Sequence, residues 1–270
     1  MPPELISSPS NPLLKRIRKL RQRKHRAAEG ALFVEGIAPV WAAIDAGAGV
    51  ELLVVAPDLL TSDRAGELLS RVDAPVSQLT AGAFESIAER ENPSGLGALV
   101  AIPSRALDDV VLDETALVVA LDEVGNPGNL GTIVRTADAA AAAAVVVAGD
   151  AADAWHPGAV KASMGTVFST PVVAAPLDEV LAWARKEALA VVATSAHGRV
   201  DHWFADYPDR CLLLFGSEAT GLSQETLAAA DEVVRIPQQG AASSLNLAVA
   251  AGIVIYEAVK RRARPDAAPQ

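Results

Sequence analysis

Residues 212–223 read LLLFGSEATGLS, and this stretch decides the fold class. An apolar run without polar alternation is typical of a parallel strand whose two faces are both covered by helices. The run stops at Gly216, and Glu218 and Gly221 follow at once in a loop of small residues. In open α/β sheets, ligands bind at such loops, beyond the carboxyl ends of the strands. The stretch therefore predicts a doubly wound α/β domain with Glu218 at its binding edge.

The same pattern continues on both sides of this stretch. Apolar runs alternate with helix-like segments, which is the order of a mostly parallel α/β sheet. Strands are predicted at 116–124, 145–150, 190–198, 210–216 and 231–237, and helices at 129–143, 176–189 and 245–263, with a loop and helix over 155–173.

The front of the chain predicts a second, smaller α/β domain. Strand-like runs at 31–36, 50–57 and 95–103 enclose helix-like stretches at 37–47 and 61–72, and we expect a small, mostly parallel sheet. A proline and several acids interrupt the apolar pattern between residues 102 and 115. We therefore expect an N-terminal domain over 1–104, a catalytic domain over 113–264 and a disordered tail over 265–270.

Composition narrows the function classes. The 270 residues are 51% hydrophobic and 4% aromatic, as expected for one or two packed domains. The single cysteine, Cys211, excludes a disulfide framework within the chain and any multi-cysteine metal site, and we expect it in the core; no metal site is predicted. No apolar run is long enough to span a membrane and the N-terminus lacks a signal pattern, so the expected location is the cytoplasm.

Charge is distributed unevenly. The net charge is −10, yet residues 1–30 hold eight Lys or Arg against two Glu. This density is typical of proteins that bind a phosphate backbone, although a solvated helix explains it too. The candidate RNA-binding residues are Lys15, Arg16, Arg18, Lys19, Arg21, Arg23, Lys24 and Arg26.

Three loops leave predicted strands with glycines and polar side chains. The first covers 122–138 and has glycines at 125, 128 and 131, a spacing that misses the dinucleotide fingerprint G-x-G-x-x-G. A nicotinamide-dependent oxidoreductase, with Asp150 as its ribose-binding acid, stays open as an alternative. The second loop is 216–223, and the third, after residue 237, leads into the last helix. Together they predict one small-molecule pocket.

Single residues in these loops also have purely structural readings. Asn129 fits a helix N-cap, and Arg135 fits a surface ion pair. Ser244 and Asn246 fit caps of the last helix. Only the combination of the three loops favours a site.

Three segments then resemble a known family. NPGNLGTIVRTADAA (126–140), LLFGSEATGLS (213–223) and IPQQGAASSLNLAVAAGIVIYEA (236–258) are similar, in order, to the three motifs of the SpoU (TrmH-type) RNA ribose 2′-O-methyltransferases. Residues 6–40 are similar to the RNA-binding domain, related to a ribosomal protein fold, that precedes the catalytic part in many members. The resemblance covers nearly the whole chain.

The resemblance implies a fold, a cofactor and site residues. The catalytic domain is expected to be an α/β-knot fold, whose chain forms a deep trefoil knot. S-adenosylmethionine is the implied cofactor, and a homodimer is implied through the C-terminal helix and the second motif. The matched cofactor-binding positions are Thr194, Ser195, Ala196, Gly216, Ile236 and Leu245, and the matched catalytic positions are Asn129, Arg135, Glu218, Ser244 and Asn246.

The family assigns the role of general base to the arginine of the first motif, here Arg135. A guanidinium stays charged and has no acceptor. We therefore expect Arg135 to bind the phosphate beside the target ribose and to stabilise the developing alkoxide. The favoured substrate is 23S-type ribosomal RNA, with transfer RNA as the alternative. A catalytically inactive RNA-binding protein is a further alternative.

Overall fold

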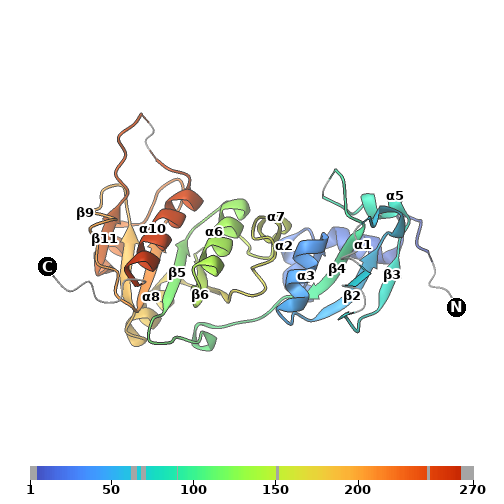
Figure 1. Ribbon diagram of the computed structural model, residues 1–270, viewed down its shortest axis with the longest axis horizontal. Coiled ribbons are helices and arrows are strands. Elements are labelled where there is room, and N and C mark those ends of the chain that lie inside the picture. Colours follow the sequence, from blue (N-terminus) through green and yellow to red (C-terminus); the bar gives the residue numbers. More distant parts are fainter. Residues whose placement is uncertain are drawn as a thin grey trace. The chain divides into compact units, whose positions relative to one another are not determined.

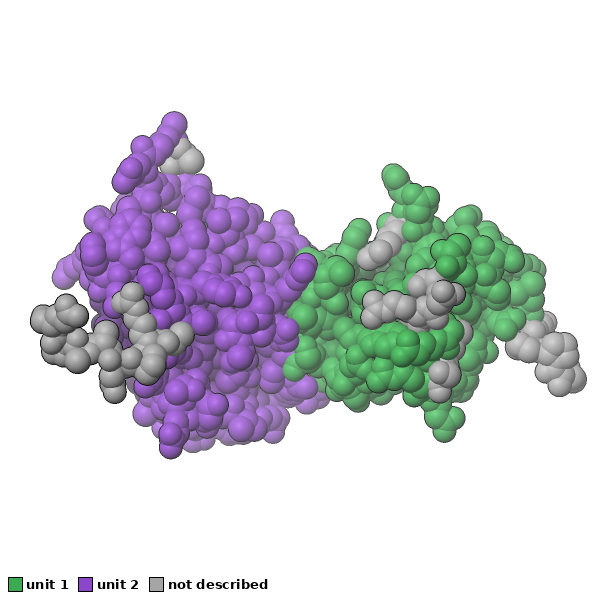
Figure 2. Space-filling model, in the orientation of Figure 1, with its two compact units in different colours: residues 1–103, 155–169 green, residues 104–154, 170–270 purple. Residues whose placement is uncertain are grey.

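The computed structural model describes residues 5–61, 66–67, 71–89, 91–149, 152–241 and 244–262. The chain divides into two compact units, one of residues 1–103 and 155–169 and one of residues 104–154 and 170–270 (Figure 2). The expected tail over 265–270 and most of the helix expected over 61–72 lie outside the described residues.

The N-terminal unit has a four-stranded sheet in the order β1-β4-β2-β3. β4 pairs antiparallel with both β1 and β2, and only β2 and β3 are parallel, so the mostly parallel sheet predicted here is wrong. The reason is that the last strand inserts between the first two. The strands are β1 (Ala31–Glu35), β2 (Val50–Val55), β3 (Val76–Gln78) and β4 (Leu96–Ala101).

Helices cover this sheet and build its core. Leu14, Ile17 and Leu20 pack with Phe84 and the strand residue Val54 in one buried cluster. The helices are α1 (Pro12–Lys19), α2 (Arg23–Glu29), α3 (Ile37–Asp45) and α5 (Ala81–Glu85), with a short 3₁₀ turn η1 (Pro57–Leu59).

Residues 155–169 come late in the sequence but pack within the N-terminal unit. Helix α7 (Pro157–Ala162) contacts β1, and Val167 and Phe168 are each 2% exposed. Gly165 approaches α3 so closely that a Cβ would lie 2.5 Å from the Cβ of Ala42. The expected division at 104–113 misses this segment, because burial of apolar side chains places it away from its neighbours in the sequence.

The C-terminal unit has a seven-stranded sheet in the order β7-β6-β5-β10-β8-β11-β9, and all of its pairings are parallel (Figure 1). The unpredicted strands β7 and β9 are short and lie at its two edges. The strands are β5 (Leu117–Asp122), β6 (Ala144–Ala148), β7 (Val172–Ala175), β8 (Ala190–Thr194), β9 (Val200–Asp201), β10 (Cys211–Phe215) and β11 (Glu232–Arg235).

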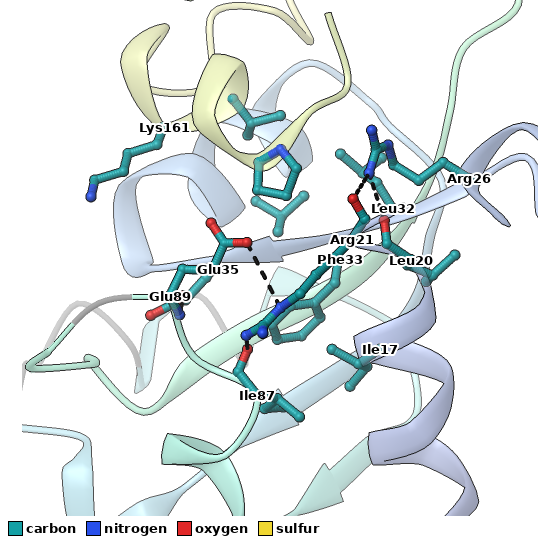
Figure 3. Close-up of a pocket in the computed structure, with 13 residues that line it drawn as sticks. Ile17, Leu20, Arg21, Arg26, Leu32, Phe33, Glu35, Ile87, Glu89 and Lys161 are labelled. Carbon is teal, nitrogen blue, oxygen red and sulfur yellow. Dashed lines mark hydrogen bonds and ion pairs between the residues drawn. The ribbon is translucent and has the colours of Figure 1, made fainter. Parts of the chain in front are cut away.

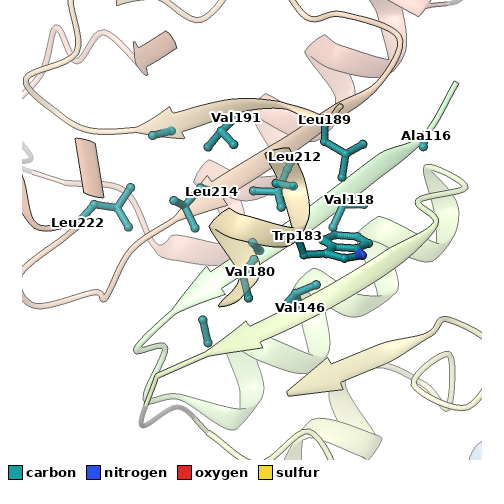
Figure 4. Packing of buried hydrophobic residues seen from close by; sticks show 14 residues of the cluster. Ala116, Val118, Val146, Val180, Trp183, Leu189, Val191, Leu212, Leu214 and Leu222 are labelled. Atoms are coloured by element: carbon teal, nitrogen blue, oxygen red, sulfur yellow. The ribbon is translucent and has the colours of Figure 1, made fainter. Parts of the chain in front are cut away.

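Helices cover both faces of this sheet, as its uniformly apolar strands require. Val180, Trp183 and Ala184 of α8 pack on Val118 and Leu212 of one face (Figure 4). Helices α6 and α10 pack on each other, α6 contacts β6 and α10 contacts β10. Cys211 is fully buried, as expected. The helices are α6 (Pro127–Ala139), α8 (Leu177–Lys186), α9 (Gln224–Ala229) and α10 (Leu247–Arg262), with a 3₁₀ turn η2 (Leu107–Asp109).

No helix in the part of the chain that the structure describes combines the length and the apolarity that a membrane crossing requires.

Candidate functional site

The loop after β5 leads into α6 through a cap that is not Asn129. The Asn126 side-chain oxygen accepts hydrogen bonds from the backbone amides of Gly128 (2.8 Å) and Asn129 (3.1 Å), and Pro127 begins the helix. The capping reading of Asn129 is therefore wrong. Its side chain is available for other contacts.

Asn129 joins residues from all three predicted loops. Its Nδ2 donates to Glu218 Oε1 at 2.9 Å, and its Oδ1 accepts from Asn246 Nδ2 at 3.0 Å. Glu218 Oε2 also accepts a hydrogen bond from the amide of Gly125, at 3.3 Å. Segments some 90 and 117 positions away from Asn129 in the sequence thus meet at one amide side chain.

Asn246 serves both the helix and the network. Its Oδ1 accepts from the amide of Ala248 at 2.9 Å and from that of Val249 at 3.3 Å, which caps α10. Its Nδ2 remains free to donate to Asn129, since a carboxamide accepts and donates at different atoms. The capping reading of Asn246 is correct but incomplete.

A pocket lies beside this network, at the carboxyl ends of β8, β10 and β11 and the start of α10. Its volume is about 380 Å³, within the usual range of ligand sites. All six positions matched to cofactor binding line it, together with Glu218 and Ser244. Sequence reasoning missed five polar residues of the lining, which are His197, Ser217, Thr220, Gln224 and Gln238. Three of them, Ser217, Thr220 and Gln238, lie inside the quoted motifs.

Two glycines let the backbone close around this pocket. A Cβ on Gly216 would lie 2.4 Å from the carbonyl carbon of Gly221, and a Cβ on Gly198 would lie 2.6 Å from the carbonyl carbon of Val234. Real Cβ atoms do not approach backbone so closely. These positions therefore require glycine.

Among the described residues, Arg135 does not take part in the hydrogen-bond network of Asn129, Glu218 and Asn246. It lies on α6, is exposed, and does not line the pocket. The alternative ribose-binding acid, Asp150, lies outside the described residues.

Five of the eight predicted RNA-binding cations are engaged in contacts within the structure, and Arg23 is one of them. Arg26 is 2% exposed and its Nη1 donates to the carbonyls of Leu20 and Arg21, both at 2.7 Å. Its assignment to RNA is therefore corrected, because a buried guanidinium holds the α1–α2 turn instead. Three further arginines are also engaged. Arg16 binds Glu29 and Glu51, and Arg18 donates to Pro9 and Ser86. Arg21 donates to the carbonyls of Ile87 and Ala88.

The pKa of the Glu218 carboxyl depends on the hydrogen bonds of this network. Burial would raise the pKa of Glu218, but hydrogen bonds from Asn129 and from backbone amides outweigh it and hold the pKa below its ordinary 4.5. We expect Asn129→Ala to raise that pKa, and Asn129→Asp to raise it further through like-charge repulsion.

Carboxyl NMR titration of the wild type and the two variants measures this shift. Because the folded-state pKa is the lower one, the contribution of Glu218 to stability is present above pH 4.5 and is lost as the pH falls through the folded-state value. An unchanged Glu218 pKa in both variants would contradict the network.

Two family models match the chain. Residues 11–98 match the MRM3-like substrate binding domain, and residues 116–256 match the SpoU rRNA Methylase family. The chain belongs to the SpoU rRNA methylase family. This confirms the resemblance seen in its motifs.

Relatives and solved structures of this SpoU family member agree with that assignment. The chain is 37% identical to a 23S rRNA (uridine(2479)-2′-O)-methyltransferase of Streptomyces viridochromogenes, covering 90% of this chain and 87% of the relative. It is 30% identical to the 23S rRNA (guanosine(2553)-2′-O)-methyltransferase RlmP of Bacillus subtilis, covering 93% and 97%. The crystal structure of the SpoU methyltransferase AviRb from S. viridochromogenes with the cofactor AdoMet matches with a TM-score of 0.86 and 35% identity, over 93% and 98%.

The fold class expected for the SpoU member is also confirmed. It is an α/β-knot domain with a parallel sheet, preceded by a smaller α/β domain.

Proposed function

We propose that this protein transfers a methyl group from S-adenosylmethionine to a ribose 2′-hydroxyl of 23S-type ribosomal RNA. The observation that carries the proposal is the network in which Asn129 bridges Glu218 and Asn246 beside one pocket. Its relatives in the SpoU family, named as 23S rRNA 2′-O-methyltransferases, support the same activity and substrate class.

The pocket fits S-adenosylmethionine. It is large enough, its walls are mostly apolar, and Glu218 is the one carboxylate among its described lining residues. Thr194, Ser195, Ala196, Gly216, Ile236 and Leu245 would hold the cofactor, largely by backbone groups at strand ends. When bound, S-adenosylmethionine supplies an activated methyl group on its sulfonium centre.

The protein's own task is to align the ribose with the methyl donor, while the proton of the 2′-hydroxyl passes to solvent water. Orientation alone supplies up to about 7–11 kcal/mol of barrier lowering at the favourable limit. The network of Asn129, Glu218 and Asn246 orients the ribose, together with Ser244 of the pocket lining. Arg135 binds the adjacent phosphate and stabilises the alkoxide as it forms, because a guanidinium donates hydrogen bonds and cannot accept them.

RNA recognition begins at lysines of the N-terminal unit. Lys15, Lys19 and Lys24 are exposed and, within the part of the chain that the structure describes, have no partner. We expect the triple variant Lys15→Ala, Lys19→Ala, Lys24→Ala to bind RNA more weakly. The slope of log affinity against log salt should fall by about 2–3, since each lost phosphate contact removes about 0.7–0.9.

Arg26→Ala is the contrasting variant. We expect it to lower the free energy of unfolding by about 2 kcal/mol, because one buried and one partly buried carbonyl lose their donor. Filter binding over a salt series and thermal melting separate the two effects. An unchanged salt slope in the triple variant would overturn the assignment of these lysines.

The apolar outer face of α10 supports a homodimer. Val249 is 53% exposed and Tyr256 is 50% exposed, while Ala251, Val254 and Ile255 face the core. Large exposed apolar side chains in one stripe mark an association surface. A second copy of the chain is the partner that we propose for it.

A charge on this stripe should dissociate the dimer. We expect Val249→Asp with Tyr256→Asp to weaken self-association about tenfold or more, because the partner would bury an unpaired carboxylate. Sedimentation velocity measures the dissociation constant, and Ala182→Asp, on an exposed site of α8, is the control. A monomeric wild type would contradict the proposal.

The proposed function also implies which RNA is the substrate and where in the cell the protein acts. Ribosomal RNA is favoured over transfer RNA, and the protein would act in the cytoplasm. Mapping 2′-O-methyl groups in ribosomal and transfer RNA from a strain lacking the protein tests this. A site lost only from transfer RNA would refute the ribosomal substrate.

A further inference from the structure

The segment 155–169 connects β6 and β7 of the C-terminal sheet, yet it packs in the N-terminal unit. Lys161 of α7 lines a small cavity there together with Ile17 of α1 and Phe33 of β1 (Figure 3). Val167 and Phe168 of the segment are buried. Apolar burial therefore holds the segment, and the chain on either side of it belongs to the C-terminal unit.

The residues on either side of this segment are hydrogen-bonded to α6 or to the loop that leads into it. Before the segment, the amide of Ala152 donates to the carbonyl of Val124 at 2.6 Å, and Val124 lies in that loop. After it, Thr170 Oγ1 donates to Asp138 Oδ1 at 3.0 Å, and Asp138 lies in the last turn of α6. The two flanks of the segment thus contact the chain at the two ends of this helix.

A hydrogen-bond donor favours Asp138 at this position. The C-terminal end of a helix carries a partial negative charge, so a carboxylate in the last turn is unfavourable unless a donor offsets it. The hydroxyl of Thr170, a residue that is only 3% exposed, provides that donor. Asp138 follows Arg135 by three residues, and residues three apart are neighbours on a helix surface. The contact therefore holds the turn of α6 from which Arg135 extends.

We propose that Thr170 is a positioning residue for methyl transfer, a proposal that rests on the function above. Through Asp138 it fixes the turn of α6 that carries Arg135. Alignment governs the rate of such a transfer, because a misplacement of about 1 Å costs up to about 100-fold. Thr170 does not line the cofactor pocket, so its loss slows the transfer and leaves cofactor binding intact.

Single-turnover methyl transfer to unmodified 23S ribosomal RNA by the full chain tests the proposal. Thr170→Val removes the hydroxyl and keeps the shape of the side chain. We expect it to slow transfer about tenfold, because the turn that carries Arg135 loses its anchor while the buried face of α6 stays packed. The concentrations of RNA and S-adenosylmethionine that give half the maximal rate should stay within about twofold of those of the wild type.

Two further variants separate positioning from general stability. Thr170→Ser keeps the donor and should restore a near-wild-type rate. Thr166→Val is the matched control, because the hydroxyl of Thr166 donates to the carbonyl of Ser163 within segment 155–169, at 2.9 Å. It should leave the rate unchanged. A slow Thr170→Ser, or equal losses in Thr166→Val and Thr170→Val, would overturn the proposal.

Asp138 gives an independent test, since it is exposed and its substitution spares the core. Asp138→Ala removes the acceptor and should slow transfer about tenfold, whereas Asp138→Asn keeps an oxygen that accepts from Thr170 and should stay near the wild type. This pair decides the question even if Thr170→Val does not fold.

The double variant of Asp138→Ala and Thr170→Val should be no slower than either single variant, because the losses of two partners in one contact do not add. A combined loss of about 100-fold would mean that the two residues act separately, which contradicts the proposal.

The wild type scores the proposed function in the same experiment. Methylation of 23S ribosomal RNA by the wild type, with an equal rate in Thr170→Val, removes the Thr170 proposal alone. No methylation by a wild type that binds both RNA and cofactor removes both proposals.

Discussion

Replacing Arg135 by alanine is expected to slow single-turnover methyl transfer by about 100- to 1,000-fold, the cost of removing one donor from a developing oxyanion. Arg135 is exposed and has no other described task on α6, so its loss should leave the fold intact. Affinity for S-adenosylmethionine should stay unchanged, because Arg135 does not line the pocket.

Arg135→Lys separates charge from geometry. A lysine keeps the positive charge but loses the planar, bidentate donors, so we expect partial activity between the wild type and alanine. Arg185→Ala, on α8, is the control for loss of an exposed cation. Near-native rates in both Arg135 variants would remove its catalytic role.

The second large effect is expected from Gly216→Ala. The new Cβ would lie 2.4 Å from the carbonyl carbon of Gly221 and 2.5 Å from the amide nitrogen of Leu222, so backbone must move. The loop that moves carries Glu218 and lines the pocket. We expect affinity for S-adenosylmethionine to fall about 10- to 100-fold, in line with the cost of overpacking.

Gly125→Ala is the matched control for this substitution. A Cβ there meets nothing within 4 Å, and the amide that donates to Glu218 is retained. Calorimetric titration with S-adenosylmethionine compares the two, and melting temperatures check the fold. Equal affinity of both variants for the cofactor would mean that the loop does not hold it.

The parallel sheet of the C-terminal unit could be predicted from sequence because its strands are continuously apolar. Nearly every residue of β5, β6 and β10 is buried. Side chains on both faces of these strands are therefore apolar, which indicates a sheet covered on both faces. The two-residue β9 lies at a sheet edge and has too little pattern to predict. The antiparallel insertion of β4 in the other sheet depends on long-range pairing that local pattern does not encode.

The site could be predicted in part. Motif positions identified six residues of the pocket lining as cofactor-binding positions. The close approach that requires glycine at 216 is seen only in the structure. Asn129 was ambiguous, since only the structure shows that Asn126 takes the capping role. Arg26 was misassigned because a basic run does not reveal which of its members turns inward.

Transfer of label from tritiated S-adenosylmethionine to RNA, followed by digestion to nucleosides, tests the central claim most directly. The account predicts that wild-type protein places the label in a 2′-O-methylnucleoside of 23S ribosomal RNA, and that Gly216→Ala at low cofactor concentration and Arg135→Ala do not. Label found on a base, or no transfer by wild-type protein that binds both cofactor and RNA, would contradict it.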